Sequence, residues 1–247
     1  MKQKYAHRGA FQSDLVAWGD IVTCDHLVSP SLKMQCLGGE KFGLSVKDLH
    51  SGMIAVYPVT EKDATSTIES LRHFAGRKKI HNIYSDNALE LAASARSLGI
   101  EHHTSLPGEP KTNSIIERTN QIIVGGTTAS LIAAGLPPCY WSYATQCFCT
   151  NFNAQGMLEE SPWEKVHKTA FPAIIIPFGA LVFYRPPNTG AHAAGKWEGN
   201  ARKGIFAGYQ MRSVTEWSKQ YLVWDLNTFK NSDLRTSATY RHQRIGE

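Results

Sequence analysis

Long apolar runs are absent from this sequence of 247 residues. None approaches the ~20 consecutive apolar residues that a helix needs to cross a bilayer. Residues 1–17 are polar and lack the apolar segment that marks a secretory signal. We therefore expect an intracellular protein that has no membrane partner.

Cysteine is sparse, and its spacing excludes two common uses. No pair has the C-x-x-C spacing of zinc sites and redox motifs, and the odd number does not fit a disulfide framework. A reducing compartment is therefore the better expectation. The five cysteines are Cys24, Cys36, Cys139, Cys147 and Cys149.

A strong excess of charge of either sign is also missing. The 26 Lys and Arg residues and the 21 Asp and Glu residues give a formal net charge of +5 at pH 7. Most of this excess lies after residue 155. A near-neutral first part and a more basic second part fit a nucleic-acid partner. A net charge of this size is also ordinary for a soluble protein, so composition alone does not decide the function.

The apolar pattern predicts a mixed α/β protein. Short apolar runs that end at turn residues indicate strands at 18–27, 41–47, 53–59, 82–85 and 100–104. Apolar residues at helical spacing indicate helices at 61–75, 88–98, 113–134 and 140–153. Three strands followed by alternating helices and strands indicate a sheet with flanking helices. Residues 176–229 read as a smaller β-rich unit with glycine turns.

Three carboxylate residues lie at the ends of predicted strands or at the start of a predicted helix. Asp25 follows the apolar run 21–24, Asp86 follows Ile83 and Tyr84, and Glu117 falls in the first turn of a helix. Clustered carboxylates repel one another and stay ionised together only beside cations. Oxygen ligands suit Mg²⁺ or Mn²⁺ rather than zinc. Two such ions can clamp the attacking and leaving oxygens of a phosphodiester.

Each acid also has an ordinary structural interpretation. Asp25 could cap a turn, and Asp20 competes with it for the metal role from the opposite face of the strand. Ser85 and Asn87 could simply form a turn. Glu117 could be an acid that favours the first turn of a helix. Taken one at a time, these interpretations are preferable, and only the combination of the three acids reverses that.

The sequence around these acids resembles that of a known family. Residues 85–87 with Glu90 are similar to the motif S-D-N-G-G-E, and residues 110–120 are similar to P-Q-x-N-G-x-x-E-R-x-N. Both motifs occur in the integrase core of retroviruses and of long-terminal-repeat retrotransposons. Residues 161–166 and 203–209 resemble stretches that follow this core in the copia type. The resemblance covers roughly residues 18–229.

The resemblance implies an architecture. It implies an α/β fold: a ribonuclease-H-like core, with a mixed five-stranded sheet and flanking helices, followed by a small β-rich C-terminal domain. The expected division is an N-terminal tail at 1–17, the catalytic core at 18–155, a linker helix at 156–175, and a basic β-rich domain and tail at 176–247.

The resemblance also implies a chemistry. Asp25, Asp86 and Glu117 would be both the catalytic residues and the ligands of two Mg²⁺ or Mn²⁺ ions. The reaction would be 3′-end processing and strand transfer on double-stranded DNA, by a homo-oligomer in the nucleus, with no small-molecule substrate. The expected DNA contacts are Lys111, Asn113, Arg118 and Asn120, with weaker candidates at Arg185, Lys196, Trp197, Arg202 and Lys203.

Several departures from the family pattern keep other functions open. The segment between Asp86 and Glu117 is shorter than is usual, both glycines after Asp86 are replaced, and Gly125 and Gly126 interrupt the Glu117 helix. The His/Cys zinc module that usually precedes the core is missing, so a fragment is expected. The alternatives are a catalytically inactive or domesticated nucleic-acid-binding remnant, and a ribonuclease-H-like nuclease without strand transfer.

Overall fold

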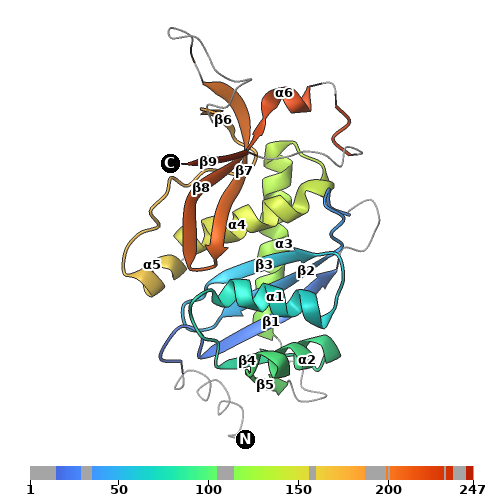
Figure 1. Ribbon diagram of the computed structural model, residues 1–247, viewed down its shortest axis with the longest axis vertical. Helices are drawn as coiled ribbons and strands as arrows, with labels where there is room; N and C mark the ends of the chain where they lie inside the picture. Colours follow the sequence, from blue (N-terminus) through green and yellow to red (C-terminus); the bar gives the residue numbers. More distant parts are fainter. Residues whose placement is uncertain are drawn as a thin grey trace, which may run out of the picture.

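The computed structural model describes residues 15–28, 35–104, 114–155, 160–186, 199, 201–230, 232–235 and 243–246. Two sheets and the helices around them make up this part of the chain (Figure 1). The described helices include none that alone has the length and apolar composition of a membrane span. Two consecutive helical segments, Ser114–Ala134 and Pro138–Gln155, pass that test only when taken together, and they are bent by 119°.

The first sheet confirms the expected five-stranded core. Its strand order is β3-β2-β1-β4-β5. Strand β2 is antiparallel to both of its neighbours, β1 and β3, whereas β4 and β5 continue the sheet parallel to β1. This is the ribonuclease-H-like arrangement. The strands are β1 (Ile21–Val28), β2 (Phe42–Asp48), β3 (Ile54–Val59), β4 (Asn82–Ser85) and β5 (Glu101–Thr104).

Helices cover both faces of this sheet. Helix α1 (Ala64–Ala75) packs on the face that carries the apolar side chains of β1 and β2, and helix α2 (Leu89–Leu98) lies beside α1. Helix α3 (Ser114–Ala134) packs against β1 and β2 on the other face. Helix α1 starts three residues later than expected because Asp63 caps it by accepting a hydrogen bond from the Ser66 amide at 2.7 Å.

The first expected strand is also shorter at its start and longer at its end. It begins at Ile21 because Asp20 folds the preceding residues into a turn, where its carboxylate accepts hydrogen bonds from the amides of Val16 and Ala17. It continues to Val28, which pairs with Phe42 of β2.

The second sheet is antiparallel, in the order β6-β7-β8-β9. It extends past residue 229, because β9 pairs with β8. The expected linker at 156–175 contains the short helix α5 (Pro162–His167), which Ser161 and Glu164 start with a capping box. The boundaries between the two parts stay a prediction. The elements of the second sheet are β6 (Leu181–Tyr184), β7 (Arg202–Ser213), β8 (Glu216–Asp225) and β9 (Gln243–Gly246), with helix α6 (Leu226–Phe229) after β8.

Helix α4 (Trp141–Gln155) connects the two sheets, and a 3₁₀ turn (Pro138–Tyr140) leads into it. It packs on β3 of the first sheet and on β7 of the second (Figure 1). The rings of Tyr140 and Tyr143 both make edge-to-face contacts with the ring of Trp224, which is fully buried. A single cluster of buried residues therefore extends through both sheets.

The same helix protects the free edge of β3. Asn153 accepts a hydrogen bond from the Ile54 amide at 2.9 Å and donates one to the Ile54 carbonyl at 2.7 Å. Its side chain thus replaces a neighbouring strand at this residue. Pro58 has no amide hydrogen, so it offers no donor to another strand. An edge blocked in this way resists pairing with a further chain.

The two glycines in helix α3 differ in their surroundings. A Cβ atom at Gly126 would overlap the ring of Phe148 on α4, whereas a Cβ atom at Gly125 would meet nothing. Gly126 therefore permits the close approach of α3 and α4, while Gly125 only lowers the helix propensity. The interruption noted in the sequence has a packing reason at one of its two positions.

Candidate active site

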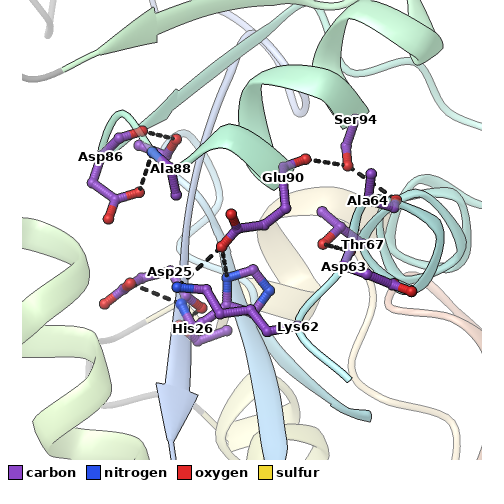
Figure 2. Close-up of polar contacts among 12 residues, drawn as sticks. Asp25, His26, Lys62, Asp63, Ala64, Thr67, Asp86, Ala88, Glu90 and Ser94 are labelled. Atoms are coloured by element: carbon purple, nitrogen blue, oxygen red, sulfur yellow. Dashed lines mark hydrogen bonds and ion pairs between the residues drawn. The ribbon is translucent and has the colours of Figure 1, made fainter. Parts of the chain in front are cut away.

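The parallel pairing of β1 with β4 places two of the predicted acids side by side. Thr23 pairs with Tyr84, and Asp25 and Asp86 each follow two residues later in the same chain direction. Asp25 in β1 is therefore level with Asp86, which directly follows β4, and both residues are half-buried. Figure 2 shows the two side chains. Asp25 does not end its strand, as the sequence suggested, because β1 continues to pair with β2 beyond it.

The carboxylate of Asp25 is held at both oxygens. Its Oδ1 accepts a hydrogen bond from the His26 amide at 2.7 Å, and its Oδ2 accepts one from Asn120 Nδ2 at 2.9 Å. Burial raises the pKa of Asp25, and the negative charge of Asp86 adds to that effect. The two hydrogen bonds and the ammonium of Lys62 act in the opposite direction.

Asp86 lies in the short connection between β4 and α2. Its Oδ1 accepts a hydrogen bond from the Ala88 amide at 3.3 Å, and its carbonyl accepts one from Ser85 Oγ at 2.9 Å. Ser85 is fully buried and also contacts His102 Nε2 at 2.8 Å. Ser85 therefore does more than form a turn, because it ties the Asp86 backbone to β5.

A second polar cluster lies directly beside Asp25 (Figure 2). Lys62 Nζ is 3.0 Å from Glu90 Oε1, and His26 Nδ1 is 3.6 Å from the same oxygen. Burial and the charge of Lys62 lower the pKa of His26, so at neutral pH the imidazole is neutral and the charged partner of Glu90 is Lys62. The His26 side chain is only 2% exposed.

Glu117 is not brought to the two aspartates in the same way. It lies exposed in the first turn of α3, whereas Ile116 and Thr119 face the sheet. The contact between α3 and Asp25 is made one turn later, by Asn120. Among the residues that the structure describes, no group of three or more His, Cys, Asp or Glu side chains is arranged to hold a metal ion.

The other predicted contacts are scattered. Lys111 and Asn113 fall outside the described residues, and Arg118 is exposed beside Glu117. The observed partner of Asn120 is Asp25, so its role as a DNA contact stays a prediction.

The weaker DNA candidates lie in or near the second sheet. Arg185 is exposed, Arg202 lies 3.8 Å from Asp225, and Lys203 lies over the ring of Phe183. Lys196 and Trp197 fall outside the described residues.

Asp20 is not part of the site. Its carboxylate accepts hydrogen bonds from the amides of Val16 and Ala17, in the turn before β1. A cavity of about 580 Å³ also lies elsewhere, between β3, α1, α4 and β7. None of the predicted site residues lines this cavity, so the cavity is not part of the candidate site.

Sequence reasoning missed the roles of Lys62, His26 and Glu90. The sequence shows His26 directly after Asp25, and Glu90 four residues after Asp86 as part of a motif, but it assigns neither of them this contact. Lys62 lies far from both in the chain, and no local pattern links it to them. The ion pair depends on the packing of α1 beside α2, which only the fold reveals.

Comparison with known proteins finds similar sequences among retrotransposon polyproteins. A retrovirus-related Pol polyprotein from the tobacco (Nicotiana tabacum) transposon TNT 1-94 is 30% identical over 144 residues, which are 54% of this chain. A second such polyprotein, from the Arabidopsis thaliana transposon RE1, is 29% identical over 170 residues, or 63% of this chain. The chain is similar to Pol polyproteins of copia-type transposons. It spans 11% of the length of each of these two relatives.

Solved integrase structures show weaker likeness. The catalytic core of HTLV-2 integrase, a trimeric form in complex with magnesium, has a TM-score of 0.48 and 20% identity, over 62% of this chain and 99% of that one. The catalytic core of BIV integrase has a TM-score of 0.46 and 16% identity, over 61% of this chain and 95% of that one. No protein-family model matches the chain.

Proposed function

We propose that this chain is the integrase segment of a retrotransposon polyprotein and that it performs DNA 3′-end processing and strand transfer. One observation carries the proposal: Asp25 in β1 lies level with Asp86, which directly follows the end of the neighbouring parallel strand β4. The similarity to copia-type Pol polyproteins supports the same reaction class. The activity, its substrates and its partners are proposals, since the chain spans a small part of those relatives.

The donor chemistry at Asp25 and Asp86 suits a hard divalent cation. Carboxylate oxygens are the ligands that Mg²⁺ and Mn²⁺ prefer, and the pair is half-buried at the C-terminal end of β4. Asp25 and Asp86 would hold the metal, and Glu117 would complete the site from α3. Two ions, when bound, supply activation of the attacking oxygen and stabilisation of the leaving 3′ oxygen.

The residues of the chain prepare this site. Asn120 and the His26 amide orient the Asp25 carboxylate, and Ser85 fixes the backbone at Asp86. The attacking oxygen is that of water in 3′-end processing and that of the trimmed 3′-hydroxyl in strand transfer. No covalent protein intermediate forms, so the reaction needs no serine or cysteine nucleophile.

The partners follow from the reaction. Double-stranded DNA is the substrate, both as the end of the element and as the target. The exposed Arg118 lies on the same turn of α3 as Glu117, where it would contact phosphate. We propose a homo-oligomer assembled on two DNA ends, acting in the nucleus, without a small-molecule substrate.

A strand-transfer assay tests the proposal. Purified protein is given a pre-trimmed DNA end, a target duplex and either Mg²⁺ or Mn²⁺. We expect metal-dependent joining that Asp86→Asn abolishes and that Asp20→Asn retains, because Asp20 undergoes the same chemical change outside the site. A longer Pol segment is assayed in parallel, because the chain spans a small part of its relatives.

The other outcomes separate the alternatives. Metal-dependent cutting without joining would instead identify a nuclease of the same fold. Salt-sensitive DNA binding without any product, in both the chain and the longer segment, would identify a non-catalytic remnant.

A further inference from the structure

The start of helix α1 is fastened to helix α2 by a buried serine. Ser94 Oγ lies 3.1 Å from the Ala64 carbonyl and 2.6 Å from the Glu90 carbonyl, and Ser94 is fully buried (Figure 2). This contact is uncharged and lies in the second turn of α2. It fixes the body of α2 relative to α1, but it does not reach the residues that precede α2.

The first turn of α2 lacks an ordinary cap. Ala88 occupies the position before the helix, and its side chain has no oxygen that could accept from the first amides. Two acidic side chains lie close to this end of the helix. Asp86 accepts the Ala88 amide at 3.3 Å, and Glu90, one residue inside the helix, pairs with Lys62 at 3.0 Å. The ion pair therefore holds the first turn of α2, which directly follows the connection that carries Asp86.

Lys62 is itself well anchored. It directly precedes Asp63, which caps α1 through the Ser66 amide at 2.7 Å and whose carbonyl accepts from Thr67 Oγ1 at 2.7 Å. The Lys62 side chain is 38% exposed and the Glu90 side chain 18% exposed, so the pair is partly shielded from water. The ammonium of Lys62 thus holds the carboxylate of Glu90, which lies four residues after Asp86.

We propose that the Lys62–Glu90 ion pair is a positioning device that holds the Asp86 connection beside Asp25. The proposal rests on the proposed function only in taking Asp86 as a metal ligand. Lys62 and Glu90 are positioning residues, because they act through Asp86 and touch neither substrate nor metal. Side chains that orient a metal ligand typically change metal affinity about 10- to 100-fold when they are removed.

Positioning and simple charge effects predict opposite results for one variant. If only charge mattered, Lys62→Met would strengthen Mn²⁺ binding, because it removes a cation near the site, and Glu90→Gln would weaken it. If the pair positions Asp86, both substitutions weaken Mn²⁺ binding. The double variant then loses about as much as either single variant, since all three break the same contact.

Calorimetric titration with Mn²⁺ alone, on the whole chain, makes this comparison. We expect affinity to fall about tenfold in Lys62→Met and Glu90→Gln, and Lys62→Arg to restore most of the loss in the first. Arg212→Met is the matched control, because it breaks an ion pair of similar length, 3.2 Å to Glu216, in the second sheet. Unchanged or tighter binding in Lys62→Met would overturn the proposal.

Amide hydrogen exchange of the metal-free protein gives a second, independent measurement. We expect faster exchange at Ala88 and Ala92 in Lys62→Met, with unchanged exchange at Ser94 and in the Arg212→Met control. Equal exchange rates in wild type and Lys62→Met would contradict the proposal. If wild type binds no Mn²⁺, the proposed metal chemistry fails, and the exchange rates alone then decide whether the ion pair holds the Asp86 connection.

Discussion

The side-chain amide of Asn120 donates a hydrogen bond to Asp25 Oδ2 at 2.9 Å and so joins helix α3 to strand β1. These residues are distant in sequence, and one of them is a predicted catalytic acid. The contact fixes the orientation of that acid before any ligand arrives. It also sets the height of α3 on the sheet, and therefore the height of Glu117, one turn earlier on the same helix.

Replacing Asn120 should change the acidity of Asp25. The hydrogen bond from Asn120 stabilises the charged carboxylate and lowers the pKa of Asp25 against the larger, opposing effect of burial. Asn120→Ala should therefore raise that pKa further and cost about 1–2 kcal/mol of stability. Carbon-13 NMR titration of the Asp25 carboxyl group measures the shift. Arg118→Ala, an exposed change on the same helix, should leave the titration unchanged; an equal shift in both variants would contradict this role.

Asp25 should reduce the stability of the folded protein at neutral pH. Burial raises its folded-state pKa, so the folded protein becomes less stable as pH rises from the unfolded value, about 3.9, through the folded one. Asp25→Asn removes this loss of stability. The Oδ1 atom of Asn120 is buried without a hydrogen-bond partner, and after the Asn120 side-chain amide flips it can accept a hydrogen bond from the new side-chain amide at position 25. We expect a higher Tm than wild type at pH 7 and a difference that shrinks towards pH 4.

Asp20→Asn is the control of opposite sign for that measurement. Hydrogen bonds from the Ala17 and Val16 amides lower the pKa of Asp20, so its contribution to stability is present above its unfolded pKa and is lost as pH falls. Its replacement should lower Tm at pH 7. A gain in Tm for Asp25→Asn that does not depend on pH would show that packing, and not ionisation, is responsible.

The sequence predicted the elements that depend on local pattern. Strands β2, β3 and β4 and the helix that carries Glu117 were expected close to their observed positions, because period and turn residues are local signals. Strand β9 was missed because only its pairing with β8 reveals it. The pairing of Thr23 with Tyr84, which aligns Asp25 with Asp86, is likewise a contact between distant residues, and here the family resemblance supplied what periodicity could not.

The two glycines of α3 give a matched pair of stability predictions. Gly125→Ala adds a methyl group in open space, and we expect a gain of up to about 1 kcal/mol from helix propensity and from a less flexible unfolded chain. Gly126→Ala places a methyl group against the Phe148 ring and should cost about 1–3 kcal/mol. Urea unfolding of the two variants and wild type measures both differences. Equal effects at the two positions would show that α3 and α4 do not pack as described.

Asn153 illustrates a role that its residue type does not reveal from sequence. The sequence placed Asn153 at the end of an expected helix and gave it no role. Its side chain is nevertheless buried and makes two hydrogen bonds with the backbone of Ile54. It takes the place that a sixth strand would occupy beside β3. Recognising this requires the distance between α4 and the sheet edge, which depends on the whole fold.

Removing Asn153 should therefore weaken the protein and expose its sheet edge. Asn153→Ala leaves the amide and the carbonyl of Ile54 without partners, at about 1–3 kcal/mol for each group. Gln146→Ala, an exposed change on the same helix, should stay within about 0.5 kcal/mol of wild type. Urea unfolding measures both values, and light scattering after mild heating should show faster aggregation of Asn153→Ala alone, because an unpaired edge strand can pair with another chain. A variant that unfolds earlier yet aggregates no faster would show that the remaining contacts of α4 and Pro58 still block the edge without Asn153.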